Sequence, residues 1–61
     1  MTGRYLAVPF VRYKDAVGGH FKAQGEPKFD LLGNAIEYCK AVPNTFVFDT
    51  QENLTVWGRP K

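Results

Sequence analysis

Cys39 and His20 are the two residues of this 61-residue chain whose types could form a nucleophile and its base. Cys39 falls on the apolar stripe of a predicted helix, where a free cysteine is usually buried and unreactive. His20 follows Gly18-Gly19, and an exposed histidine is favoured there over a general base on a flexible loop. No partner for either residue is identifiable, so we expect no enzymatic activity and no catalytic residue.

Other reactive groups are equally sparse. The acidic residues are most easily explained as turn, cap and solvated positions: Asp15, Glu26, Asp30, Glu37, Asp49 and Glu52. One His and one Cys make a zinc site within one chain very unfavourable. The glycines match neither a Walker loop nor a GxGxxG run. We therefore expect no metal and no cofactor.

Composition indicates one small domain spanning residues 1–61. The chain is 44% hydrophobic and 15% aromatic, which argues against disorder. A chain of this size buries only about 60% of the surface that its unfolded form exposes, so self-association is an open possibility. The net charge is +2, with basic residues concentrated in the N-terminal half and acidic residues in the C-terminal half.

The sequence favours a cytoplasmic protein without a membrane segment. A single cysteine cannot form an intramolecular disulfide, which fits a reducing compartment. Arg4, Pro9 and Arg12 interrupt the N-terminal apolar run, so no signal peptide is visible there. No run approaches the eighteen or so apolar residues of a membrane span.

The stretch Thr45–Trp57 predicts a β-hairpin, because two alternating apolar runs flank a polar link. A three-residue loop of Gln51, Glu52 and Asn53 would place Asn53 in the left-handed conformation that Asn tolerates. The register that follows pairs Thr50 with Leu54, Phe48 with Val56, and Val47 with Trp57.

Earlier in the chain we expect a strand at Tyr5–Tyr13, limited by Pro9, and a short strand at His20–Gln24. Asp30 is the expected N-cap of a helix that ends before Pro43. The predicted fold is α+β: a small four-stranded, mainly antiparallel sheet with one helix packed on one face, in strand-strand-helix-strand-strand order.

The helix is expected to cover the face that carries Phe46 and Phe48. The predicted core consists of Leu6, Val8, Phe10, Phe21, Leu32, Ile36, Cys39, Phe46, Phe48, Leu54 and Val56. Trp57 then lies on the opposite, uncovered face beside Val47. This uncovered face predicts a binding site formed by Trp57, Val47, Tyr5, Tyr13, Arg12, Lys22 and His20.

Three occupants of that face are compatible with its residues. A protein partner is favoured, because Trp, Tyr and Arg are frequent interface residues. A homodimer or a minor core is the second possibility. Nucleic acid is the third, since aromatics interleaved with basic residues can stack on bases and neutralise phosphates. We expect a non-enzymatic binding protein that masks or modulates a macromolecular partner.

The order of strand, glycine-containing turn, strand and helix, with Asn34-Ala35-Ile36-Glu37, resembles the N-terminal domain of antitoxins of the HicB type. The resemblance stops before the terminal hairpin and implies an antitoxin-like regulator. The composition is also similar to that of phage and mobile-element accessory proteins that bind a host protein.

Overall fold

Two antiparallel strands, β1 (Tyr5–Pro9) and β3 (Thr45–Asp49), form the centre of the sheet in the computed structural model. β2 (Lys28–Phe29) pairs with β1, and β4 (Leu54–Trp57) pairs with β3. The strand order is β2-β1-β3-β4, and every neighbouring pair is antiparallel. The predicted α+β class and four-stranded antiparallel sheet are confirmed.

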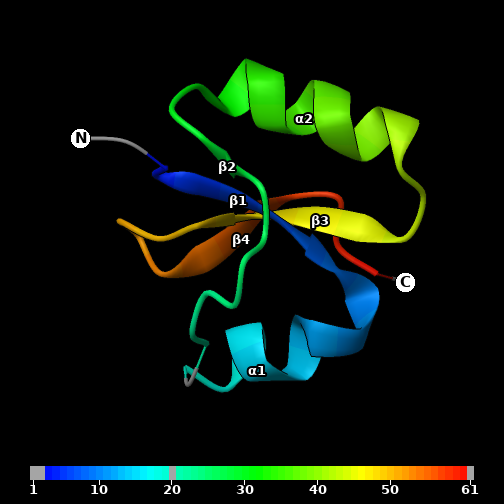
Figure 1. Ribbon diagram of the computed structural model, residues 1–61. Helices are drawn as coiled ribbons and strands as arrows, with labels where there is room; N and C mark the ends of the chain where they lie inside the picture. The colour runs from blue at the N-terminus through cyan, green and yellow to red at the C-terminus, as the bar shows by residue number, and fades with distance from the viewer. Residues whose placement is uncertain (1–2, 20, 61) are drawn as a thin grey trace.

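A helix covers each face of this sheet in the structure, which describes residues 3–19 and 21–60. α2 (Leu32–Ala41) lies across one face. On the other face the 3-10 turn η1 (Phe10–Arg12) leads into the short helix α1 (Tyr13–Val17) (Figure 1). α2 is the predicted helix, whereas α1 is an element that the sequence analysis did not anticipate.

The predicted strand Tyr5–Tyr13 is wrong beyond Pro9. Proline has no N–H to donate to a ladder, and β1 is a central strand that ends at this residue. The chain then turns into η1, and the N–H of Phe10 donates to the carbonyl of Asn44 at 2.9 Å. Asn44 has φ 62°, so a left-handed asparagine stands where the chain enters β3.

The second strand also lies elsewhere than predicted. His20 is outside the described residues, and residues 21–24 form no strand. The strand that pairs with β1 is instead Lys28–Phe29, and the N–H of Ala7 adds a bond to the Pro27 carbonyl at 3.1 Å. A strand of two residues is too short to show an alternating pattern.

α2 begins without the carboxylate cap expected at Asp30. Its N-cap residue is Leu31, which has extended backbone and makes no side-chain capping bond. The Asp30 carboxylate accepts instead from the N–H of Gly3 at 2.7 Å, which ties the N-terminal segment to the start of the helix. The helix ends at Ala41, before Pro43, as predicted.

The β3–β4 hairpin is confirmed, but its loop is one residue longer than expected. Thr50 does not pair with Leu54, because its N–H and its hydroxyl both donate to the carbonyl of Arg4, at 2.9 and 2.7 Å. Asn53 has φ 59°, the left-handed conformation that the sequence predicts. Its N–H donates to the Asp49 carbonyl at 2.7 Å and closes the loop.

A register shift within β4 changes the rest of the hairpin. Val47 pairs with Trp57 as predicted, whereas Phe48 pairs with Thr55 and not with Val56. Val56 is therefore the extra residue of a β-bulge. A bulge leaves one residue unpaired and increases the local twist, so the alternation of faces is interrupted at this point.

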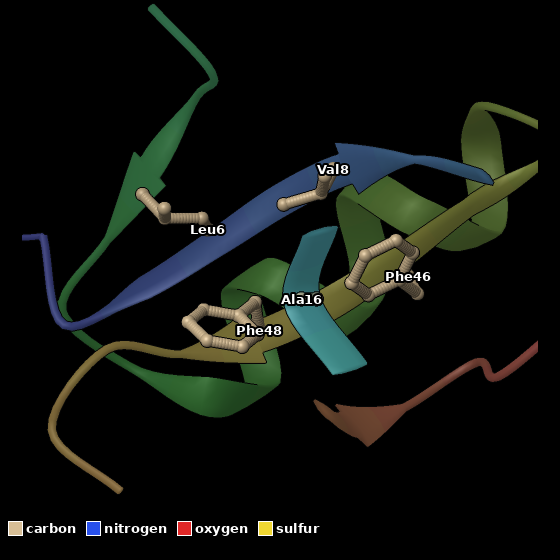
Figure 2. Close-up of a cluster of buried hydrophobic side chains, with 5 residues drawn as sticks. All are labelled: Leu6, Val8, Ala16, Phe46 and Phe48. Carbon is tan, nitrogen blue, oxygen red and sulfur yellow. The ribbon is translucent and has the colours of Figure 1, made fainter. Parts of the chain in front are cut away.

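The two central strands are buried on both faces. On the α1 side, Ala16 lies over the side chains of the sheet (Figure 2). The buried cluster there is Leu6, Val8, Ala16, Phe46 and Phe48. On the α2 side it is Ala7, Ala35, Cys39 and Val47. The prediction that the long helix covers the Phe46 and Phe48 face is therefore wrong.

The predicted core is largely confirmed apart from β4. Buried members are Leu6, Val8, Cys39, Phe46 and Phe48; partly buried members are Phe10, Phe21, Leu32 and Ile36. Leu54 and Val56 are 45% and 36% exposed, so their assignment to the core is wrong. The bulge and the edge position of β4 account for this difference.

Replacing Phe48 by Ala should destabilise the fold by about 3–5 kcal/mol, because it removes a buried ring and leaves a cavity. Phe48 is 2% exposed, and its ring centroid lies 4.7 Å from that of Phe21. Urea unfolding followed by circular dichroism measures the loss. Val11→Ala is the control, since Val11 is 88% exposed and its truncation should change stability by less than about 0.5 kcal/mol. Equal unfolding midpoints for the two variants would contradict this core.

Candidate functional site

The sheet face that the sequence predicts as uncovered lies beneath α2. Val47 is fully buried in the same cluster as Ala35 and Cys39. Trp57 and Tyr5 pack against this cluster as partly buried side chains. The prediction of an open sheet face is wrong, because all three candidate binding residues contribute to packing between the sheet and α2.

Tyr13, Arg12 and Lys22 belong to the opposite side of the sheet. Tyr13 meets Phe46 edge to face, with ring centroids 5.2 Å apart. Arg12 is partly buried and Lys22 is exposed, and the two are joined by a bond from the Arg12 guanidinium to the Lys22 carbonyl at 2.7 Å. His20 lies outside the described residues. The candidate residues therefore do not form one surface.

Arg12 organises the segment between α1 and β2. Its guanidinium pairs with the Glu26 carboxylate, lies 4.5 Å from the ring centroid of Phe21, and is 3.8 Å from a carboxylate oxygen of Asp15. Only 16% of the Arg12 side chain is exposed. Neighbouring carboxylates already balance its charge, so Arg12 has a structural role: it links η1 to the segment that contains Lys22 and Glu26.

The carboxyl group of Glu26 is kept ionised in its pair with Arg12. Burial raises the pKa of its carboxyl, but hydrogen bonds from backbone N–H groups, including that of Gln24 at 2.6 Å, together with Arg12 outweigh burial. The net shift of the Glu26 pKa is downward. Residues 21–27, which form no helix or strand, are thus held by charge-assisted bonds.

A second ion pair fixes the start of the hairpin loop. The Arg4 guanidinium donates to both carboxylate oxygens of Asp49, at 2.9 and 3.0 Å, and Asp49 is only 2% exposed. The bond from Arg4 lowers the Asp49 pKa most; burial opposes it, and the N–H groups of Glu52 and Gln51 lower the pKa further. Asp49 therefore joins β3, its loop and the N-terminal segment.

A surface hollow of about 480 Å³ lies beside this ion pair. Its lining residues are Arg4, Asp30, Thr50 and Gln51. Arg4 is engaged by Asp49, and the Asp30 carboxylate by the Gly3 N–H. These four lining residues are polar or charged in type, but they do not pair a nucleophile with a base.

Residues 3–19 and 21–60 contain neither a metal-binding cluster nor a membrane-spanning helix. No three His, Cys, Asp or Glu side chains within these ranges are arranged to hold a metal ion. Neither α1 nor α2 has the length and apolar character needed to cross a membrane.

The two edges of the sheet differ sharply in their protection. β2 is two residues long, contains Lys28 and follows Pro27. Short length, lysine and proline are the devices that keep edge strands from pairing with other chains. β4 is Leu54-Thr55-Val56-Trp57, which contains no charged residue and no proline. The β-bulge at Val56 is the feature of β4 that disfavours pairing with another strand.

The β4 edge, meaning Leu54–Trp57 with its outward backbone, also presents apolar side chains. Leu54 and Val56 are 45% and 36% exposed. The chain after β4 turns toward β3: Gly58 has φ 77°, and a Cβ added there would lie 3.2 Å from the Thr45 carbonyl oxygen. A glycine is required by this close approach. The β4 edge is the best candidate binding surface among the described residues.

Sequence reasoning missed this surface because it placed Leu54 and Val56 in the core. The available signal was the composition of the last strand. Leu54–Trp57 contains no charged residue and no proline, the residues that usually protect an edge strand. The bulge itself left no recognisable mark in the residue types.

No protein-family model matches the chain, and no curated protein or solved structure matches it. The likeness to antitoxins of the HicB type therefore gains no support from these comparisons.

Replacing Asp49 by Asn should cost about 1–2 kcal/mol at pH 7, because the charge-assisted bonds from Arg4 are lost. The folded-state pKa of Asp49 is lowered, so its contribution is present above the unfolded pKa of about 3.9 and disappears as pH falls through the folded value. Urea unfolding of both proteins at pH 7 and pH 3 tests this: the difference should shrink at pH 3.

Asp15→Asn is the matched control, because the Asp15 side chain is 59% exposed and 3.8 Å from Arg12. An exposed pair of this kind contributes little, so the control should change stability by less than about 0.5 kcal/mol. A difference between wild type and Asp49→Asn that is as large at pH 3 as at pH 7 would contradict the electrostatic role.

Proposed function

We propose that this chain is a non-enzymatic binding domain that masks or modulates a protein partner through the β4 edge. The observation that carries the proposal is the contrast between a protected edge at β2 and an apolar, uncharged edge at β4. An edge strand presents a row of unpaired N–H and C=O groups to which an extended segment can add.

Side chains beside the backbone support a protein partner. Strand addition gains affinity from main-chain hydrogen bonds and specificity from side chains that alternate along the edge. Leu54 and Val56 offer exposed apolar surface on β4, and Trp57 is partly exposed at the end of the strand. An extended peptide with apolar side chains is the ligand that complements these residues.

Charge distribution favours protein over nucleic acid. Phosphate recognition depends on several accessible cations, since affinity follows the number of phosphates neutralised. Arg12 is occupied by Glu26, and Arg4 by Asp49. β4 itself carries no charge. Lys14 and Lys22 remain exposed on the α1 side, and Arg59 is exposed two residues beyond β4.

Absence of catalysis is part of the proposal, and the burial of Cys39 supports it. Cys39 is 6% exposed between α2 and the sheet, next to Ala7, Ala35 and Val47. A buried thiol without an activating neighbour is chemically inert. A buried free cysteine also fits a reducing cytoplasm, the compartment that we propose.

Cys39 should therefore react slowly with a thiol reagent in the native protein and rapidly in urea. Because only local or global opening exposes the thiol, native labelling should be at least about a hundredfold slower than labelling of the unfolded chain. Absorbance of the released chromophore measures both rates. Native labelling as fast as that of the unfolded protein would reopen the catalytic reading of this residue.

The function is tested by capture from a cell lysate with wild type, Val56→Lys and Val11→Lys. The two variants add the same charge, at an exposed β4 position and at an 88% exposed position on η1. Lysine on an edge strand disfavours pairing. A protein that is captured by wild type and Val11→Lys, and at least about tenfold less by Val56→Lys, supports the proposal.

Thermal melts of all three proteins establish that they remain folded. Capture that is equal for wild type and Val56→Lys would overturn the β4 assignment. Capture of nucleic acid, lost on raising the salt concentration and unaffected by Val56→Lys, would replace the protein partner by the nucleic-acid alternative.

A further inference from the structure

We infer that the β4 edge pairs with the β4 edge of a second copy of this chain, antiparallel about a two-fold axis. The inference rests on the function proposed above, because it names a partner for the same edge. Each copy supplies four strands, so the dimer contains one continuous sheet. Two-fold symmetry brings the same patch of both copies together, and identical neighbouring strands are then antiparallel.

The ends of β4 are complementary in charge for this orientation. Glu52 lies two residues before the strand, and Arg59 lies two residues after it. Both residues are exposed. In an antiparallel pair the start of one β4 lies beside the end of the other, which brings Glu52 of each copy toward Arg59 of its mate. A parallel arrangement would place like charges together.

The centre of the same strand is apolar and self-complementary. Leu54 and Val56 are both exposed in the single chain, and an added strand covers part of each. No charge has to be buried between the two copies, since Leu54–Trp57 contains none. Gly58 lies against the Thr45 carbonyl, so the chain is still beside β3 where it leaves β4.

Size supplies the third argument. A chain of 61 residues buries a smaller fraction of its surface than a larger domain does, and pairing of copies is one way in which such domains gain stability. A dimer links stability to concentration, so the melting temperature should rise as protein concentration rises. The β2 edge cannot serve in the same way, because Pro27 and Lys28 protect it.

Sedimentation equilibrium over a range from about 1 μM to 1 mM tests the inference on the whole chain. Wild type and Val11→Lys should dimerise alike, and Val56→Lys should weaken dimerisation at least about tenfold. Glu52→Arg and Arg59→Glu should each weaken it about tenfold at low salt, since each reversal affects two symmetry-related pairs. The double variant Glu52→Arg with Arg59→Glu should restore it.

Restoration by the double variant is the outcome that separates an antiparallel β4 dimer from other associations. Wild type that stays monomeric up to 1 mM overturns the inference. A dimer that is insensitive to Val56→Lys and to both charge reversals also overturns it. Loss of a foreign partner by Val56→Lys, with wild type monomeric, would overturn the dimer alone and leave the proposed function standing.

Discussion

Burial of β1 and β3 on both faces is the constraint on which the rest of this structure depends. The two strands pair through five residues each, from Tyr5 opposite Asp49 to Pro9 opposite Thr45. Two strands with apolar side chains above and below need two covers. α2 supplies one and α1 the other, which is why so short a chain is built as three layers (Figure 1).

Side-chain size explains which helix takes which face. The α2 face of the central strands carries Ala7 and Val47, and Ala35 of the helix lies against them, so the ten-residue helix can approach closely. Phe46 and Phe48 fill the opposite face themselves. Ala16 of the five-residue helix α1 covers them (Figure 2), together with the partly buried rings of Phe10, Tyr13 and Phe21.

The elements with strong local signals could be predicted from the sequence. α2 has an apolar stripe and is followed by Pro43, which cannot continue a helix. The hairpin loop contains Asn53, which adopts the left-handed conformation that the turn needs. The parts that could not be predicted depend on distant contacts. Thr50 joins the loop because it bonds to the Arg4 carbonyl, and no nearby residue indicates that partner.

The wrong face assignment has the same origin. Alternation along a strand predicts one buried face and one open face. Leu6-Ala7-Val8 and Phe46-Val47-Phe48 are instead continuous apolar runs, the pattern of strands buried on both sides. Continuous apolar runs of this kind predict that both faces of the central strands are covered, so neither face is open to solvent. The aromatic residues Tyr5 and Trp57 then belong to packing, and recognition has to be sought elsewhere.

With both faces used for packing, the two edges are the parts of the sheet that remain for the recognition proposed above. Protection of an edge restricts which residues it can contain, and β2 carries that restriction through its length, Lys28 and the preceding Pro27. β4 carries uncharged, β-branched and aromatic residues, which favour strand pairing. Because β2 is protected and β4 is not, a strand from another chain would extend the sheet at β4 and not at β2.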